Sequence, residues 1–162
     1  MNRRYALFIL GVGPLATLST FATLARAHHG WSSFDQSRSI YLQGKVGAVK
    51  WANPHAEMEL MVSPDLALPG DLANRPIPAQ SASVDGKSLL SKATVPARKD
   101  KVWRIELAPL SRMEAWKIDR LTPGEPIEVV GFTFPAEKGE AILRADFLFR
   151  GGKAYALRSS PA

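Results

Sequence analysis

Five short segments of this chain have the side-chain pattern of β-strands, and their spacing constrains the fold more than any other feature of the sequence. The clearest one lies within residues 55–62, where His55, Glu57 and Glu59 alternate with apolar residues. Period-two alternation is typical of a strand that buries one face. The segments cover residues 39–51, 56–62, 102–107, 126–134 and 141–150. The sequence therefore predicts a mainly β protein, with a further hairpin arm over residues 151–157.

Two local features suggest how the strands are arranged. The first segment contains Gly44 and Gly47, which are candidates for a bulge or a bend. Between the third and fourth segments, Ser111 and Glu114 have the spacing of a capping box, so a short helix should run to about Ile118. A bent first strand, five strands in all and a helix between strands three and four fit a small OB-like barrel. A small β-sandwich is the alternative.

Residues 63–101 differ from the rest of the chain because they contain five prolines and show little periodicity. We interpret them as a long loop insertion in the barrel. Such an insertion is either a flexible excursion or a functional loop, since long loops in compact domains often carry function.

The amino-terminal residues have the order of a secretory signal peptide. Arg3 and Arg4 precede an apolar stretch that ends at Ala25-Arg26-Ala27, which fits the small-residue cleavage pattern. We expect residues 1–27 to be removed and a mature periplasmic or secreted protein to begin at His28. An uncleaved membrane anchor is the alternative, because the stretch approaches the length of a spanning helix, although Pro14 and several hydroxyl residues argue against it. The arginine pair also half-matches a twin-arginine signal.

Composition limits what residues 28–162 can be. They are about as long as one ordinary domain, and we expect a single OB-like domain there with no membrane span. The chain has no cysteine, so disulfides and thiolate metal sites are excluded. Cleavage removes three arginines and no acid, which lowers the net charge from +6 to +3. This weak, scattered charge argues against a nucleic-acid partner.

The three histidines suggest a metal site. Cleavage after Ala27 would give His28 a free amine beside its ring, and His55 could add a third nitrogen, with His29 next in the chain. Nitrogen-only coordination of this kind favours copper(II). Cleavage after Ala25 would instead place His28 third from the amine, in an amino-terminal copper and nickel chelate. The ordinary alternative is that His28 and His29 are solvated and that His55 bonds its own turn.

Other candidate ligands have simpler explanations. Glu57 and Glu59 could support a metal-bound histidine, but they also fit a solvated strand face. Thioether ligation of copper(I) is conceivable for Met58, Met61 and Met113, although Met58 and Met113 fall on apolar faces that favour the core. The aromatic residues fit either core packing or an OB-type stacking platform for bases or sugars; they are Trp31, Phe34, Tyr41, Trp51, Trp103 and Trp116.

No enzymatic motif is present. The sequence contains no Gly-x-Ser-x-Gly elbow, no phosphate-binding glycine loop and no His-Glu-x-x-His. We therefore do not predict an enzyme.

Several motifs occur in an order that resembles a family of exported bacterial proteins catalogued as domain of unknown function 6152. They are His28-His29-Gly30, Phe34-Asp35, Gly44-Lys45-Val46, Trp51-Ala52-Asn53-Pro54-His55, Ser111-Arg112-Met113-Glu114, Leu121-Thr122-Pro123-Gly124-Glu125 and Val130-Gly131. The chain departs from that family in its insertion and at Trp116-Lys117, where the family tends to have arginine and glycine. The resemblance implies export and a shared fold, directs attention to the three histidines and names no reaction.

Three hypotheses follow. The first is a periplasmic domain that binds copper through His28, His29 and His55 and serves a metal-handling or redox protein of the cell envelope. The second is a metal-free interaction domain that docks an envelope protein. The third is an OB-like module for an oligosaccharide or another small ligand.

Overall fold

The period-two segments form strands whose bounds lie within two residues of those expected from the sequence. The computed structural model describes residues 30–162 of the chain. Its strands are β1 (Ile40–Lys50), β2 (Glu57–Val62), β3 (Val102–Glu106), β4 (Pro126–Phe132), β5 (Ile142–Arg150) and β6 (Lys153–Ala156). The expected signal peptide lies outside the described residues.

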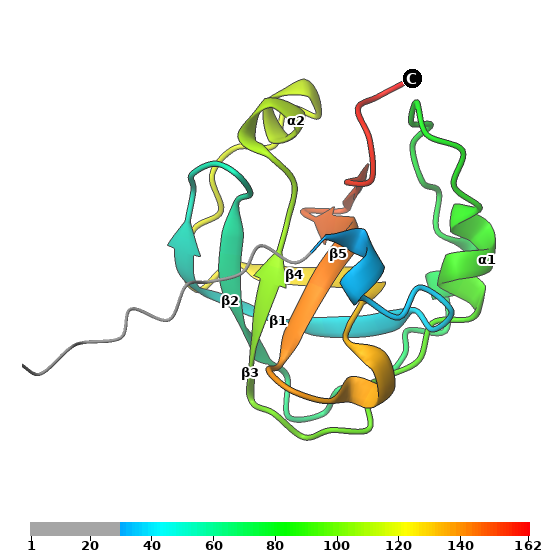
Figure 1. Cartoon of the computed structure of the whole chain (residues 1–162), viewed down its shortest axis with the longest axis vertical. Coiled ribbons are helices and arrows are strands. Elements are labelled where there is room, and N and C mark those ends of the chain that lie inside the picture. Colours follow the sequence, from blue (N-terminus) through cyan, green and yellow to red (C-terminus); the bar gives the residue numbers. More distant parts are fainter. Residues whose placement is uncertain (1–29) are drawn as a thin grey trace, which may run out of the picture.

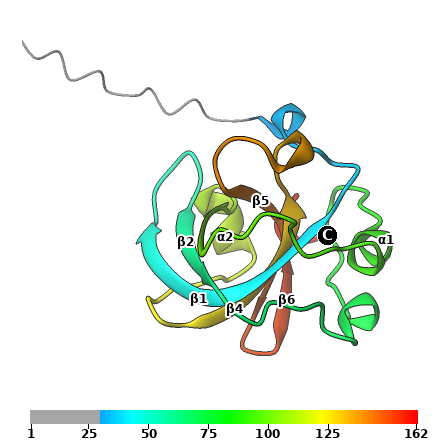
Figure 2. The ribbon, with the colours of Figure 1, turned by 90° about the horizontal axis from the view of Figure 1, so that it is seen from below.

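The sheet closes on itself. Its strand order is β3-β2-β1-β4-β5-β6, and β3 also pairs with β5 in parallel, so β1 to β5 form a closed barrel. Figures 1 and 2 show this barrel from two directions. The five-stranded OB-like barrel predicted from the sequence is therefore confirmed. β6 extends it as the far arm of the expected hairpin, whose turn contains Gly151 and Gly152, both with positive φ.

The first strand bends where its glycines predict. The register between β1 and β2 shifts between Val46 and Val49, so Gly47 lies in the irregular stretch. Gly44 is needed for a different reason, because a Cβ atom there would lie 2.1 Å from the backbone oxygen of Met61. Any side chain at Gly44 would push β1 away from β2.

The helix between β3 and β4 is present as α2 (Leu110–Ala115), but its ends differ from those expected. Pro109 is the N-cap residue and Ser111 lies inside the helix, so the capping box is wrong. The helix also stops before Ile118, because Lys117 adopts a left-handed backbone with φ of 54°.

The C-terminus of α2 forms a Schellman motif. The Lys117 N–H donates to the Glu114 carbonyl at 2.8 Å, and the Ile118 N–H donates to the Met113 carbonyl at 2.9 Å. Ile118 and Met113 are both buried, which is the apolar contact that accompanies this motif. The motif favours glycine at the position that Lys117 occupies.

We expect Lys117→Gly to raise the free energy of unfolding by about 0.5–1 kcal/mol. A left-handed conformation costs an L-residue roughly 1–2 kcal/mol, and the greater freedom of glycine in the unfolded chain offsets part of the gain. Urea denaturation measures the difference. Lys117→Ala is the matched control and should unfold like the wild type; an equal gain in both variants would contradict this explanation.

The insertion is packed against the barrel, unlike the flexible excursion considered above. It contains the 3-10 helix η2 (Leu72–Asn74) and the helix α1 (Gly86–Ser91), and α1 lies beside the barrel in Figure 1. Asp85 caps α1 by accepting a hydrogen bond from the Ser88 N–H at 2.9 Å. The insertion contributes Leu72, Leu90 and Ala93 to a second apolar core, together with Tyr41, Val130 and Phe147 of the barrel strands.

This second core explains why β5 shows no exposed face. Residues 142–149 are all buried, because Leu143, Ala145 and Leu148 face the barrel interior while Phe147 and Phe149 face the second core. A strand covered on both sides also buries the charged residues Arg144 and Asp146.

Glu137 fastens the end of the insertion to the chain between β4 and β5. It ends the 3-10 helix η3 (Pro135–Glu137) and accepts hydrogen bonds from the N–H groups of Ala97 and Arg98 at 3.0 and 2.9 Å. Arg38 pairs with the same carboxylate at 2.6 Å. Burial alone would raise the pKa of Glu137, but these three donors hold that pKa below its ordinary value.

The stabilisation by Glu137 should depend on pH. Its folded-state pKa lies below the unfolded value of 4.5, so the contribution is complete above that pH and is lost as the pH falls through the folded-state pKa. We expect Glu137→Gln to lose about 2–3 kcal/mol at pH 7, the scale of charge-assisted hydrogen bonds, and the two proteins to converge in acid. Denaturation at pH 7 and at pH 3 tests this expectation, and a constant difference at both pH values would refute it.

Candidate functional site

His55 lies where the turn before β2 meets the start of α2. The turn contains a cis peptide bond between Asn53 and Pro54. Ala56 is held to the chain after β3 by two backbone hydrogen bonds, from its N–H to the Ala108 carbonyl at 3.0 Å and from the Leu107 N–H to its own carbonyl at 2.9 Å. The turn is thereby fixed to the segment that leads into α2, and His55 is half-buried at this edge.

Arg144 of β5 lies within hydrogen-bond distance of His55. Its Nη2 lies 2.9 Å from His55 Nε2, and its Nη1 donates to Glu106 at 3.1 Å. A guanidinium only donates hydrogen bonds, so the Nε2 lone pair of His55 must accept this one. The side chains of Arg144 and Glu106 are only 6% and 10% exposed, which makes this a buried ion pair with the histidine attached to it.

Trp31 lies in the segment that precedes β1, which we call the amino-terminal arm, and it connects this arm to the same arginine. It begins the 3-10 helix η1 (Trp31–Ser33). Its ring lies 5.1 Å from the guanidinium carbon of Arg144 and 3.9 Å from that of Arg158. The ring of Phe132 meets it edge to face, with the centroids 6.4 Å apart. We call these two cations and the aromatic ring around the indole the Trp31 clamp.

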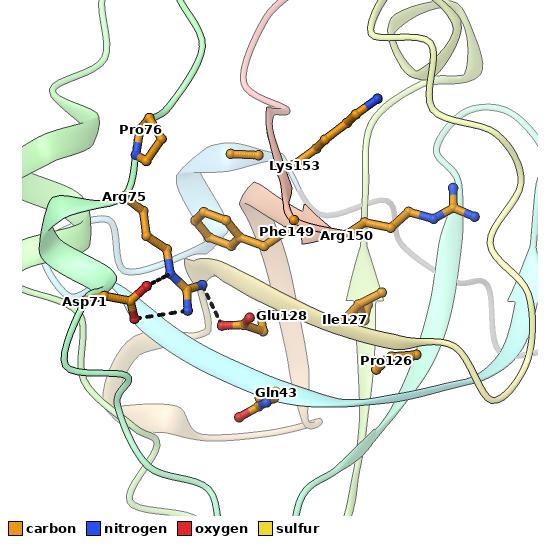
Figure 3. Close-up of a pocket in the computed structure, with 13 residues that line it drawn as sticks. Gln43, Asp71, Arg75, Pro76, Pro126, Ile127, Glu128, Phe149, Arg150 and Lys153 are labelled. Atoms are coloured by element: carbon orange, nitrogen blue, oxygen red, sulfur yellow. Dashed lines mark hydrogen bonds and ion pairs between the residues drawn. The ribbon is translucent and has the colours of Figure 1, made fainter.

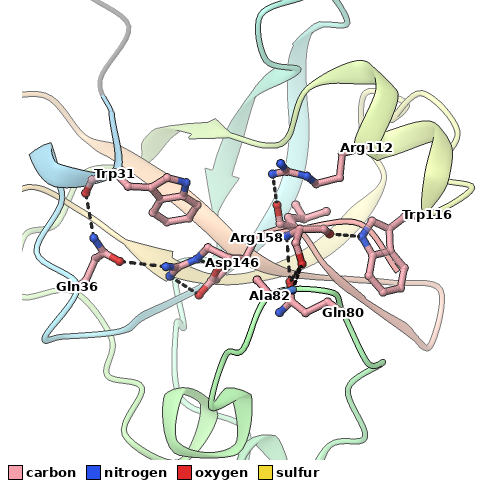
Figure 4. Close-up of polar contacts among 10 residues, drawn as sticks. Trp31, Gln36, Gln80, Ala82, Arg112, Trp116, Asp146 and Arg158 are labelled. Atoms are coloured by element: carbon pink, nitrogen blue, oxygen red, sulfur yellow. Dashed lines mark hydrogen bonds and ion pairs between the residues drawn. The ribbon is translucent and has the colours of Figure 1, made fainter. Parts of the chain in front are cut away.

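Arg158 is fixed by its contacts with Asp146 and Gln36 (Figure 4). Its Nε and Nη2 donate to the two carboxylate oxygens of Asp146 at 2.7 and 2.8 Å, in the bidentate geometry that arginine favours. Asp146 is completely buried. The Nη1 of Arg158 donates to the Gln36 side-chain oxygen at 3.0 Å, and the amide nitrogen of Gln36 donates to the Trp31 carbonyl at 3.2 Å. The clamp on Trp31 is thus a connected network.

The structure places one of the three predicted metal ligands. His55 is described, whereas His28 and His29 lie outside the described residues. Trp31 follows His29 by two positions, so the arm joins the barrel beside the arginine that bonds His55. Over residues 30–162, no group of three or more His, Asp or Glu side chains could hold a metal ion.

The candidate acids and methionines near His55 lie in different environments. Glu57 pairs with Lys50 at 3.0 Å, and Glu59 is exposed. Met58 and Met113 are buried in the core, as their apolar faces predict, while Met61 is 56% exposed.

The aromatic residues do not form a shared stacking platform. Trp103, Tyr41 and Phe34 are buried, and the Trp116 indole donates to the Ser159 carbonyl at 2.8 Å. The core-packing interpretation holds for the three buried rings.

A cleft of about 510 Å³ lies on another side of the barrel, between the insertion and the β5–β6 hairpin (Figure 3). Its central side chain, Arg75, bonds Asp71 at 3.0 Å and Glu128 at 2.7 Å and covers the Phe149 ring. Glu128 also accepts a 2.5 Å hydrogen bond from Tyr41. Burial and the carboxylate raise the pKa of the Tyr41 hydroxyl, which stays protonated as the donor. These charges stabilise one another and hold the insertion against the barrel.

Sequence reasoning missed the arginines and Asp146. The available signal was the pair of charges at Arg144 and Asp146, which share one face of an otherwise apolar strand. Charged residues within an apolar strand indicate buried ion pairs, because burial of an unpaired charge would strongly destabilise the fold.

Comparison with known proteins supports part of the expected resemblance. Residues 16–68 match the model of a family of unknown function, DUF6152. The matched stretch contains the histidine pair, Trp31 and His55, and it ends inside the insertion. No curated protein and no solved structure matches the chain. No helix over residues 30–162 is long and apolar enough to cross a bilayer.

We expect Trp31→Ala to lower the free energy of unfolding by about 1–3 kcal/mol, since it removes two cation–π contacts and an aromatic pair. Trp31→Phe keeps an aromatic face and should lose less. Urea denaturation of the three proteins measures both losses. Identical midpoints for Trp31→Ala and the wild type would show that the clamp does not stabilise the folded protein.

Proposed function

We propose that this protein is an exported domain that binds copper at the junction of its amino-terminal arm and the barrel, through His28, His29 and His55. The observation that carries the proposal is the position of Trp31. Its ring rests on Arg144, whose Nη2 is 2.9 Å from the imidazole of His55.

The distance along the chain suits this arrangement. His28 precedes Trp31 by three residues, and three extended residues span about 10 Å. An arm anchored at Trp31 would therefore keep His28 and His29 within reach of His55. Without that anchor the histidine pair would be tethered only by the chain itself.

The proposed chemistry depends on cleavage after Ala27. The free amine and the ring of His28 would then chelate one ion, and a third nitrogen from His55 would complete a set that favours copper(II). The amine and the imidazoles must be deprotonated to bind, so copper affinity should fall in acid. Ligation through Nε2 of His55 requires Arg144 Nη2 to give up its hydrogen bond, while Nη1 can remain on Glu106.

The domain would pass copper to, or hold it for, a metal-handling or redox protein of the envelope. An arm bearing exchangeable nitrogen ligands at the edge of a barrel gives such a partner access to the ion.

The first test is copper titration of the mature protein, after its amino terminus has been mapped by mass spectrometry. We expect one copper(II) per chain. Loss of a residue that only supports a metal ligand weakens metal binding by roughly 10–100-fold. His28→Ala removes a ligand itself and should weaken copper binding by more than that. His55→Gln should also weaken binding, although its amide oxygen can still accept from Arg144 and preserve the ion pair.

Met61→Leu is the matched control, because Met61 is an exposed thioether on the next strand and should leave copper(II) affinity unchanged. A large effect of His28→Ala with none for His55→Gln would indicate the amino-terminal chelate produced by cleavage after Ala25. Unchanged affinity in both histidine variants would reject the site and favour a metal-free interaction or small-ligand module.

A further inference from the structure

Arg112 differs from every other arginine that is at least partly buried among residues 30–162, because it forms no ion pair. Arg38, Arg75, Arg98, Arg104, Arg144, Arg150 and Arg158 each contact a carboxylate. Arg112 instead donates from Nη1 to the Leu157 carbonyl at 2.9 Å (Figure 4). None of its other side-chain nitrogens is both buried and unpartnered. The N–H groups that make no hydrogen bond are therefore exposed to solvent.

The position of Arg112 brings it close to Arg144. The first turn of α2 is linked to the histidine turn by a hydrogen bond of 3.4 Å from the Leu110 N–H to Asn53 Oδ1. The Leu157 N–H donates to the Asp146 carbonyl at 2.7 Å, two residues from Arg144 on β5. Burial and the positive charge of Arg144 both lower the pKa of Arg112. The two guanidinium groups therefore lie at the same edge of the barrel.

Among the described arginines at this edge, one has no counterion. Glu106 neutralises Arg144 and Asp146 neutralises Arg158, which leaves Arg112 without a counterion. Glu114 is only two residues from Arg112 on α2, so the two side chains do not share a helix face. Residues 1–29 cannot supply an acid either, since they contain no Asp or Glu, and Asp35 accepts its hydrogen bonds from Ser37.

We propose that Arg112 and Arg144 form a binding site for a small oxyanion that carries a carboxylate or phosphate group. Arg112 makes the direct contact through its free N–H groups, in the bidentate geometry that guanidinium offers to both kinds of group. Arg144, whose charge Glu106 already balances, bounds the site on its buried side. The site goes beyond copper binding, because Arg112 is not among the proposed copper ligands and its ligand is an anion.

The test is an NMR titration of the ¹⁵N-labelled mature protein with inorganic phosphate and, separately, with citrate, with sodium chloride at matched ionic strength as the reference. The reporters are the Arg112 Nε–H and the Trp116 indole N–H, which bonds the chain two residues after Leu157. We expect saturable shifts with at least one of the two anions. The anion that binds more tightly shows whether the preferred ligand carries a phosphate or a carboxylate group.

Arg112→Gln should weaken the binding at least tenfold. Arg120→Gln is the matched control, because Arg120 is an exposed arginine just beyond α2 and bonds only the Val49 carbonyl, at 3.4 Å. Arg112→Lys keeps the charge but loses the planar fork and should bind at least threefold more weakly. It replaces Arg112→Gln if that variant does not fold.

Equal affinities for the wild type and the Arg112 variants would overturn the proposal. Shifts that sodium chloride reproduces would also overturn it. Failure of the copper site is distinguishable, since His28→Ala should keep anion affinity and Arg112→Gln should keep copper affinity.

Discussion

The buried guanidinium of Arg144 joins parts of the molecule that otherwise have little in common. It lies on β5 opposite Glu106 of β3, at the parallel pairing that closes the barrel. From the same place it reaches His55 in the turn before β2 and the Trp31 ring of the arm. Breaking a buried pair of this kind leaves an uncompensated charge and costs about 3–5 kcal/mol. One side chain therefore contributes both to the closure of the barrel and to the position of the arm.

Much of the barrel could be predicted from the sequence because its strands follow a local rule. Alternation located β2, glycine located the irregular part of β1, and the helix between β3 and β4 was found despite the wrong cap. β5 was less predictable, since a strand that is covered on both faces does not show the alternation of polar and apolar residues. The packing of the insertion was not predictable either. Its buried residues Leu72, Leu90 and Ala93 are spaced irregularly in the sequence. Their spacing is determined by the shape of the barrel surface against which they pack.

The candidate site was predictable in part. The sequence singled out His55, but its neighbours come from distant positions: Arg144 is 89 residues away and Glu106 is 38 residues from Arg144. Pairs so far apart leave no spacing pattern in a single sequence. Arg112 bonds a residue 45 positions away, and Arg158 bonds Gln36, 122 positions away, so these contacts leave no spacing pattern either. His28 and His29 lie outside the described residues, so their grouping with His55 stays a prediction.

The final residues of the chain lie between two elements that they hold in place. Ser159 accepts a hydrogen bond from Trp116 of the α2 segment, and it donates to Gln80 of the insertion. Beside it, the Ser81 N–H donates to the Ser160 carbonyl. The two Ser159 contacts cross 43 and 79 residues of sequence, so neither can form before residue 159 has been made. A truncation that removes residues 159 and 160 would thus release α2 and the insertion from each other, at the edge that also carries Arg112 and Arg158.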